Sequence, residues 1–163
     1  MPQNGLSYYS LNTFFKEKFG GKTVKLSIDG GFTCPNRDGK ISTKGCIFCS
    51  EKGSGDFTPG RVMSIAEQIE EQKRRLSQKW PGTMYIAYFQ AFTNTYAPVE
   101  VLRQRYSQAI SQPGIIGLAI ATRPDCIDKK IAELLKEFSR KTYVMVELGL
   151  QTSNENTAEF INR

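Results

Sequence analysis

Three of the four cysteines lie in one short stretch, at Cys34, Cys46 and Cys49. The segment around them is rich in Gly, Pro, Asn and Asp, which favours an irregular loop over a helix or a strand. Three soft thiolates that meet at one centre suit a zinc ion or an iron–sulfur cluster. The spacing therefore predicts a metal-binding loop over residues 34–49, and the identity of the metal decides what the protein does.

The residue types of the chain favour a cluster over zinc. A closed structural zinc site takes four ligands, usually Cys and His, and this sequence contains no histidine. Cys126 alone remains to complete a set of four, and it lies about eighty residues from Cys49 without a second Cys-x-x-Cys. A four-iron cluster held by three cysteines keeps one iron open for a small-molecule ligand. For Cys126 we expect a buried small residue, with a second role left open.

The cysteine loop and several later motifs resemble a known superfamily. Cys34, Cys46 and Cys49, with an aromatic residue directly before the third cysteine, resemble the cluster loop of the radical S-adenosylmethionine (radical SAM) superfamily. Eleven residues separate the first two cysteines, where three are usual, and longer first arms are typical of the branch that contains the elongator catalytic subunit. The chain resembles the YhcC-like family of that branch from Tyr8 onwards, in stretches 27–33, 89–96, 121–125 and 146–152.

The resemblance implies a specific chemistry for the cysteine loop. Cys34, Cys46 and Cys49 would bind three irons of a [4Fe-4S] cluster, and S-adenosylmethionine would chelate the fourth with its amino and carboxylate groups. An electron from the cluster splits the cofactor in this superfamily, and the 5'-deoxyadenosyl radical takes a hydrogen atom from the substrate. A reductant such as flavodoxin or ferredoxin is implied as well. No residue is assigned as catalytic.

Three polar residues after the second predicted strand are candidates for the cofactor. Gln90, Thr93 and Asn94 stand where the family receives the methionyl amino group, although Gly-Gly-Glu is the usual sequence there. The alternative is that they only supply the polarity of a turn. Both interpretations of these three residues remain open.

Further cofactor candidates follow the third and fourth predicted strands. Glu147 ends an apolar strand, where an unpaired carboxylate would be costly to bury, and in related proteins a polar residue here holds the ribose hydroxyls. We favour this role for Glu147 over the alternative of a structural salt bridge. Arg123 would pair with Glu147 or with the cofactor carboxylate. Gln151 is a further candidate, and Phe48 would shield the cluster.

Strand-like and helix-like segments alternate along the chain. Apolar runs that begin near residues 23, 84, 115 and 143 predict four strands. The later strands recur about every thirty residues, the size of a βα unit, and right-handed crossovers would lay them parallel. We expect an α/β fold, a partial parallel (βα) barrel with about four of the six βα units of a radical SAM core. Functional groups of such folds collect at the carboxyl ends of the strands, so all the motifs are expected on one rim.

Local signals mark where helices begin and end. Ser64 and Glu67 form a capping box for a helix that ends at Pro81-Gly82. Pro98 is expected at the first position of the next helix, and Ser153 as the cap of the last one.

We divide the chain into two parts. Residues 1–22 are an N-terminal extension with a short helix over 10–19, whose aromatic side chains pack under the barrel. Residues 23–163 are the N-terminal part of a radical SAM partial barrel, truncated after strand four. The fourth strand would expose an edge that favours self-association, and the activity of such a piece is open.

Composition excludes several classes of protein. The chain has no run of eighteen apolar residues and no secretory signal, so we expect no membrane span, a cytoplasmic location and reduced cysteines. The absence of histidine rules out Ser-His-Asp and His-Glu-x-x-His chemistry.

The expected partner is RNA. A net charge of +6 attracts phosphate backbones, and the elongator-like resemblance points to transfer RNA, at the wobble uridine. The function expected is therefore a radical SAM enzyme that modifies tRNA. Two alternatives remain: a radical SAM enzyme that acts on a small molecule, and a non-catalytic zinc- or RNA-binding module.

Overall fold

The computed structural model describes residues 7–81 and 83–163. Four strands form one parallel sheet in the order β1-β2-β3-β4, with helices between them. This arrangement confirms the predicted α/β fold, consistent with a partial parallel barrel. The strands are β1 (Thr23–Ile28), β2 (Met84–Phe89), β3 (Ile115–Thr122) and β4 (Tyr143–Leu148).

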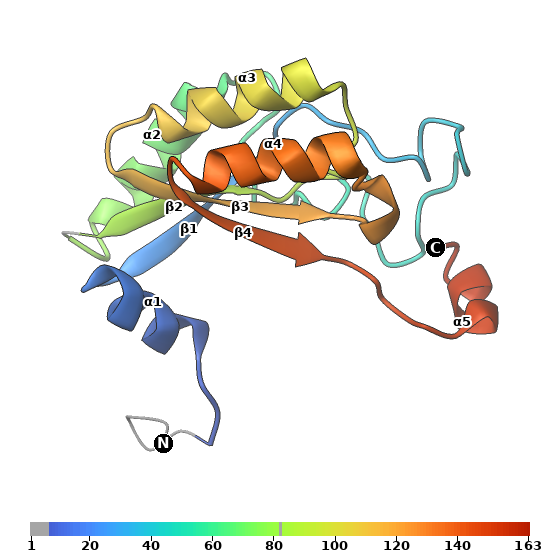
Figure 1. The fold of residues 1–163 in the computed structure, drawn as a ribbon, viewed down its shortest axis with the longest axis horizontal. Helices are drawn as coiled ribbons and strands as arrows, with labels where there is room; N and C mark the ends of the chain where they lie inside the picture. Colours follow the sequence, from blue (N-terminus) through green and yellow to red (C-terminus); the bar gives the residue numbers. More distant parts are fainter. Residues whose placement is uncertain (1–6, 82) are drawn as a thin grey trace.

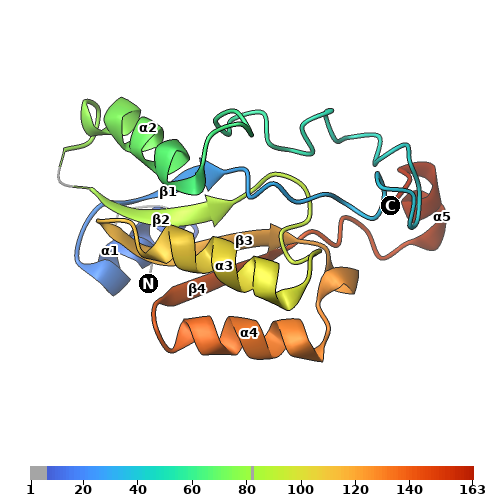
Figure 2. The same cartoon turned by 90° about the horizontal axis from the view of Figure 1, so that it is seen from above.

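Three helices cover one face of the sheet (Figures 1 and 2). They are α2 (Ile65–Ser77), α3 (Val99–Ile110) and α4 (Lys129–Ser139). Between them and the sheet lies the larger core, in which the ring of the fully buried Tyr106 contacts Phe89 and Phe138 at centroid distances of 5.2 and 5.6 Å. Burial of these apolar side chains is the main force that holds the helices on the sheet.

Helix α1 (Leu11–Phe19) lies on the opposite face of the sheet, near the start of the strands (Figure 1). Its Phe15 packs with Ile86 and Ala119, and the rings of Phe19 and Tyr143 meet edge to face at 5.3 Å. The predicted packing of these aromatic side chains under the sheet is therefore confirmed. We call this face of the sheet the inner face. Because α1 covers it only near the start of the strands, the part near the carboxyl ends of the strands is left for polar groups.

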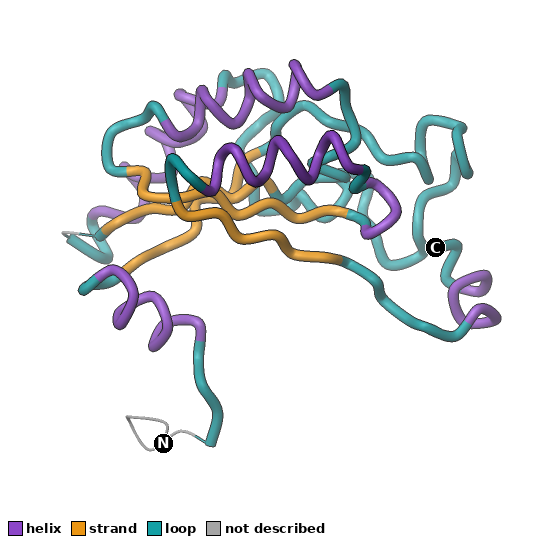
Figure 3. Tube along the Cα trace, in the orientation of Figure 1, coloured by secondary structure: helices purple, strands orange, loops and turns teal. Residues whose placement is uncertain are grey.

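The loops that follow the strands gather at one end of the sheet (Figure 3). This is a consequence of parallel pairing, which brings all the carboxyl ends of the strands to the same edge. The long loop after β1 reaches outwards to α5 (Glu155–Phe160), and the two lie side by side (Figures 1 and 2). A short 3-10 helix (Pro124–Cys126) follows β3.

Helix ends agree with the sequence signals in part. The capping box is present, with Ser64 Oγ accepting from the Glu67 backbone and the Glu67 carboxylate accepting from the Ser64 backbone. Helix α2 ends at Ser77, earlier than the predicted Pro81-Gly82, and Gly82 lies outside the described residues.

Two cap predictions were wrong by one residue. Pro98 is the N-cap of α3 and not its first helical residue. Asn154, not Ser153, caps α5, because its side-chain oxygen accepts a hydrogen bond from Thr157 N at 2.9 Å.

The predicted boundary between residues 22 and 23 falls between α1 and β1. Residues 1–6 of the predicted extension lie outside the described residues. Strand β4 is at one end of the sheet order, so within the described chain it pairs with β3 alone. Among the described helices, none is long and apolar enough to span a membrane.

Candidate active site

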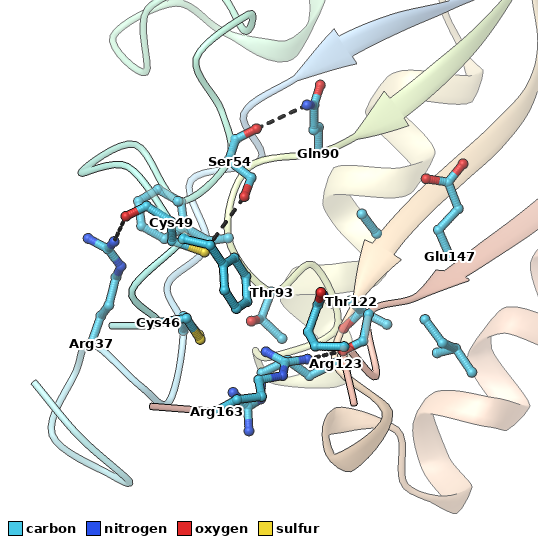
Figure 4. Close-up of a pocket in the computed structure, with 18 of the residues that line it drawn as sticks. Arg37, Cys46, Cys49, Ser54, Gln90, Thr93, Thr122, Arg123, Glu147 and Arg163 are labelled. Carbon is cyan, nitrogen blue, oxygen red and sulfur yellow. Dashed lines mark hydrogen bonds between the residues drawn. The ribbon is translucent and has the colours of Figure 1, made fainter. Parts of the chain in front are cut away.

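A cavity of about 290 Å³ lies at the carboxyl ends of the strands (Figure 4). Residues from the cysteine loop and from the segments after β2, β3 and β4 border it, so the motifs expected on one rim do meet there. Its lining includes Cys34, Arg37, Cys46, Phe48, Cys49, Ser54, Tyr88, Gln90, Thr93, Arg123, Glu147, Gln151 and Arg163.

The cysteine loop is held in shape by its own backbone and by Arg37. Gly45 N donates to the carbonyl of Asn36 at 2.8 Å, which folds the long first arm back on itself. Arg37 Nη2 donates to the carbonyls of Ser50 at 2.6 Å and Cys49 at 3.3 Å. These contacts bring the first cysteine of the loop near the other two although eleven residues intervene.

The end of the chain holds the cysteine loop from outside. Ile47 N donates to the carbonyl of Ile161 at 3.1 Å, and Asn36 Nδ2 donates to the carbonyl of Asn162 at 2.6 Å. The side chain of Asn162 in turn donates to the carbonyl of Gly45. Helix α5 therefore positions the cysteines, although no sequence signal pairs residues so far apart.

The three thiols share one environment. Cys46 is buried and Cys34 and Cys49 are half-buried. Burial raises the pKa of Cys49, and the nearby thiols of Cys46 and Cys34 raise this pKa further, against the opposing effects of Ser54 and Arg37. A positively charged group bound beside Cys49 would oppose these effects and favour its thiolate form.

Cys126 belongs to a different cavity, of about 510 Å³, bordered also by Tyr96 and Lys40. Cys126 is half-buried, so the prediction that it is a buried residue was wrong. Burial, followed by the carboxylate of Asp125, raises the pKa of the Cys126 thiol to about 11. The thiol is therefore protonated near neutral pH.

The residues after β2 divide between the cavity and the interior. Gln90 and Thr93 border the cavity, and Gln90 Nε2 donates to the carbonyl of Ser54 at 3.0 Å (Figure 4). Asn94 is fully buried and does not line the cavity; its Nδ2 donates to the carbonyls of Phe89 at 3.0 Å and Ala121 at 2.8 Å. It thereby ties the end of β2 to the end of β3.

Arg123 borders the cavity with part of its guanidinium group free of hydrogen bonds. Nε and Nη2 donate to the carboxylate of Asp125 at 2.9 and 2.7 Å, and the side chain is 8% exposed. Nη1 is buried and has no hydrogen-bond partner among the described residues. Because a buried N–H without an acceptor is costly, this atom keeps an unused capacity to bind an anion.

Glu147 is paired with Lys25 and Tyr88, not with Arg123. Lys25 Nζ lies 2.6 Å from Oε1, and the Tyr88 hydroxyl donates to Oε2 at 2.8 Å. Burial raises the pKa of Tyr88, and the hydrogen bond to the carboxylate raises it further. The predicted alternative of an Arg123–Glu147 pair was wrong, because Asp125 lies only two residues from the arginine and takes its place.

Gln151 and Phe48 lie at the margin of the cavity. Gln151 is exposed and has a left-handed backbone with φ of 74°. Phe48 is half-exposed, so it borders the cysteines without being buried itself.

Comparison with known proteins assigns the chain to a family. The sequence profile of the radical SAM superfamily matches residues 34–163. The chain belongs to the radical SAM superfamily. The match begins at Cys34, and it confirms the family expected from the motifs.

Three relatives resemble this radical SAM chain. The uncharacterized protein YtqA of Bacillus subtilis (strain 168) is 49% identical over 156 residues, which are 96% of the chain and 48% of YtqA. Protein YhcC of Escherichia coli (strain K12) is 45% identical over 147 residues, or 90% of the chain and 46% of YhcC. The uncharacterized protein MJ0486 of Methanocaldococcus jannaschii is 34% identical over 163 residues, 98% of the chain and 49% of that protein. The chain spans about half the length of these curated relatives.

The thiol donors of the radical SAM chain have the chemistry that an iron–sulfur cluster requires. In the part of the chain that the structure describes, no group of three or more Cys, Asp or Glu side chains is arranged to hold one metal ion. A [4Fe-4S] cluster makes a different demand, because each thiolate binds its own iron. Three thiols from one loop border one cavity, while Cys126 borders another cavity.

Some residues around the cavity were not anticipated from the sequence. Lys25 and Tyr88 were missed, although alternation along β1 and β2 places both on the inner face with Glu147. Arg163 also borders the cavity and donates to the carbonyl of Gly149 (Figure 4). No sequence signal connects Arg163 to the site, because its position depends on the fold of α5.

Proposed function

We propose that this chain forms the cluster- and cofactor-binding part of a radical SAM enzyme. Cys34, Cys46 and Cys49 would hold a [4Fe-4S] cluster, and S-adenosylmethionine would bind beside it. The observation that carries the proposal is that the three thiols border the same cavity as polar residues from the ends of β2, β3 and β4. A cavity that combines soft thiol ligands with polar side chains suits a cluster that shares its site with a polar small molecule.

The cofactor would be received by residues whose hydrogen-bonding capacity is free. Arg123 Nη1 would bind the carboxylate, because it is a buried cationic donor without a partner among the described residues. Gln90 and Thr93 would receive the amino group. Glu147 would accept the ribose hydroxyls with the lone pairs that Lys25 and Tyr88 leave free.

Asn94 and Gln151 would contribute in other ways. Asn94 would act as a positioning residue, because its amide holds the carbonyls of Phe89 and Ala121 and so fixes the ends of β2 and β3. Gln151, exposed at the margin, would close over the bound cofactor. When bound, the cluster and S-adenosylmethionine together supply a 5'-deoxyadenosyl radical that takes a hydrogen atom from the substrate. The chain positions the cofactor and excludes water.

For the substrate we propose transfer RNA, modified at the wobble uridine. The net charge of +6, the exposed Lys40 and Lys44 of the cysteine loop and the exposed Lys52 after it would attract a phosphate backbone. The half-exposed ring of Phe48 at the cavity would give an unstacked base a surface to stack on. The resemblance to the elongator branch points to the same substrate. The enzyme would work in the cytoplasm with flavodoxin or ferredoxin as electron donor.

Anaerobic reconstitution with iron and sulfide tests the cofactor proposal. We expect brown protein with three to four irons per chain and, after reduction, an electron paramagnetic resonance signal that changes when S-adenosylmethionine is added. Cys34→Ser, Cys46→Ser and Cys49→Ser should each lose the cluster, while the matched control Cys126→Ser keeps it. Stoichiometric zinc and no cluster, in this chain and in full-length YtqA alike, would overturn the proposal.

Nucleoside analysis tests the substrate proposal. Transfer RNA from a strain that lacks the gene should carry a wobble uridine without its normal 5-substituent, detected by mass spectrometry of the digested RNA. Reintroduction of the Cys126→Ser protein should restore the nucleoside, and reintroduction of Cys46→Ser should not. An unchanged set of wobble nucleosides together with an altered small metabolite would favour a small-molecule substrate instead.

A further inference from the structure

The side-chain amide of Asn36 donates a hydrogen bond to a cysteine sulfur of the cavity. Asn36 Nδ2 lies 3.3 Å from Cys46 Sγ, and the asparagine is 1% exposed. We propose that Asn36 tunes the reduction potential of the cluster, by donating this N–H to the sulfur of Cys46. The inference rests on the proposed function, because it requires a cluster at the three cysteines.

The orientation of the amide is fixed by a second acceptor. Asn36 Nδ2 also donates to the backbone carbonyl of Asn162 at 2.6 Å. A flipped amide would place its own oxygen against that carbonyl, and two acceptors facing each other repel. The NH₂ group has two hydrogens, so one serves the carbonyl of Asn162 and the other remains for the sulfur of Cys46.

The carbonyl of Asn162 is itself held in place. Asn162 has a left-handed backbone with φ of 55°, a conformation that asparagine tolerates better than most residues. Its side chain donates to the carbonyl of Gly45, and Gly45 N donates to the carbonyl of Asn36. Asn162 and the first arm of the cysteine loop thus hold each other in place. Asn36 is fixed by its backbone carbonyl as well as by its side-chain amide.

The amide of Asn36 is not explained by packing alone. Its Oδ1 is buried and has no hydrogen-bond partner among the described residues, which costs stability. An apolar side chain of the same branched shape would avoid that cost. An asparagine here is therefore best explained by what its nitrogen donates, and one of its two acceptors is the sulfur.

A donor at the sulfur favours the reduced cluster. Reduction adds negative charge, part of which resides on the cysteine sulfurs, and hydrogen bonds to the sulfurs are one of the means by which proteins set the potential. The effect is strong where burial excludes water, as it does at Asn36 and Cys46. Loss of the N–H should thus make the cluster harder to reduce.

The test is a redox titration of the reconstituted chain, followed by the signal of the reduced cluster. In Asn36→Leu, which keeps the branched shape and removes the donor, we expect a midpoint shifted to lower potential with the same iron and sulfide content. The matched control is Asn162→Gly, which keeps the backbone carbonyl and the left-handed backbone but removes the side-chain bond to Gly45. Its midpoint should equal that of the unmodified chain even if the loop is less stable.

The outcomes separate this inference from the proposed function. A loaded Asn36→Leu cluster with an unchanged midpoint overturns the role of Asn36 and leaves the cluster itself in place. Absence of a cluster both from the unmodified chain and from full-length YtqA overturns the proposed function. If Asn36→Leu fails to load, pulsed electron paramagnetic resonance of the unmodified chain, labelled with ¹⁵N in asparagine side chains, decides the matter. A nitrogen coupling to the reduced cluster supports the hydrogen bond, and no coupling in a loaded sample overturns it.

Discussion

Lys25 on β1 and Glu147 on β4 lie 2.6 Å apart (Nζ to Oε1), although two strands separate them in the sheet. Their side chains meet across the inner face, where Lys25 Nζ also lies 3.9 Å from the centroid of the Tyr88 ring on β2. On β3 the residue beside Glu147 in the register is only Ala121, which leaves room for this crossing. Such a contact is possible because the sheet curves, as the wall of a barrel does.

The first prediction concerns the coupling of these two charges. In a double-mutant cycle with Lys25→Met and Glu147→Gln, we expect a coupling of about 1 kcal/mol in the free energy of unfolding, the upper range for a partly exposed ion pair. The two side chains are 24% and 34% exposed, so water screens them only in part. Urea denaturation of the four proteins measures the coupling. Additive effects of the two single changes would show that the pair does not bridge the sheet in solution.

The second prediction separates Asn94 from its neighbour Gln90. Asn94→Ala leaves the buried carbonyls of Phe89 and Ala121 without the amide that donates to them. We expect a loss of about 1–3 kcal/mol in the free energy of unfolding.

Gln90→Ala is the control for this change. Gln90 is half-buried and its side chain donates a hydrogen bond to the carbonyl of Ser54, so we expect a loss of about 0.5 kcal/mol or less. Urea unfolding of both variants is the measurement. If Gln90→Ala were the more destabilising of the two, the assignment of Asn94 to the interior and Gln90 to the cavity would fail.

The cysteine loop and the rim could be predicted from the sequence for physical reasons. Parallel strands must bring their carboxyl ends together, so Cys34, Gln90, Arg123 and Glu147 had to meet once four βα units were recognised. What holds these residues in place was not predictable. The hydrogen bond between Asn36 and Asn162 joins residues that no local sequence pattern relates. The N-caps of α3 and α5 were each predicted one residue away from their true position, because a cap is decided by backbone geometry. The pairing of Arg123 with Asp125 was missed, because only Glu147 and the cofactor carboxylate were considered as its partners.

The third prediction concerns the segment that follows Cys49. Gly53 has φ of +56°, and a Cβ on it would lie 2.5–2.8 Å from atoms of the Phe92 ring. Phe92 cannot move away easily, because its N–H donates to the carbonyl of Gly53 at 2.7 Å and its own φ is 64°. We expect Gly53→Ala to cost about 1–3 kcal/mol of unfolding free energy and to reduce cluster loading.

Gly60→Ala is the matched control for Gly53→Ala. A Cβ on Gly60 meets no atom within 4 Å, so its unfolding free energy and its iron content should equal those of the unmodified chain. Thermal or urea unfolding and iron analysis compare the three proteins. Equal behaviour of the two alanine variants would contradict the close contact between Gly53 and Phe92.

The last prediction is a pH dependence that arises away from the cavity, on α4. Arg103 on α3 and Lys141 after α4 both donate to the carboxylate of Glu137, and they lower its pKa from 4.5 to about 2. Because the pKa is lower in the folded chain than in the unfolded one, Glu137 stabilises the fold fully above about pH 5, and this contribution is lost as the pH falls towards 2.

The difference in urea midpoint between the unmodified chain and Glu137→Gln should therefore be largest near neutral pH and shrink towards pH 3. Glu133→Gln, an exposed change on the same helix, is the control and should show little pH-dependent difference. A constant difference for Glu137→Gln from pH 7 to pH 3 would mean that the pair between α3 and α4 does not form in solution.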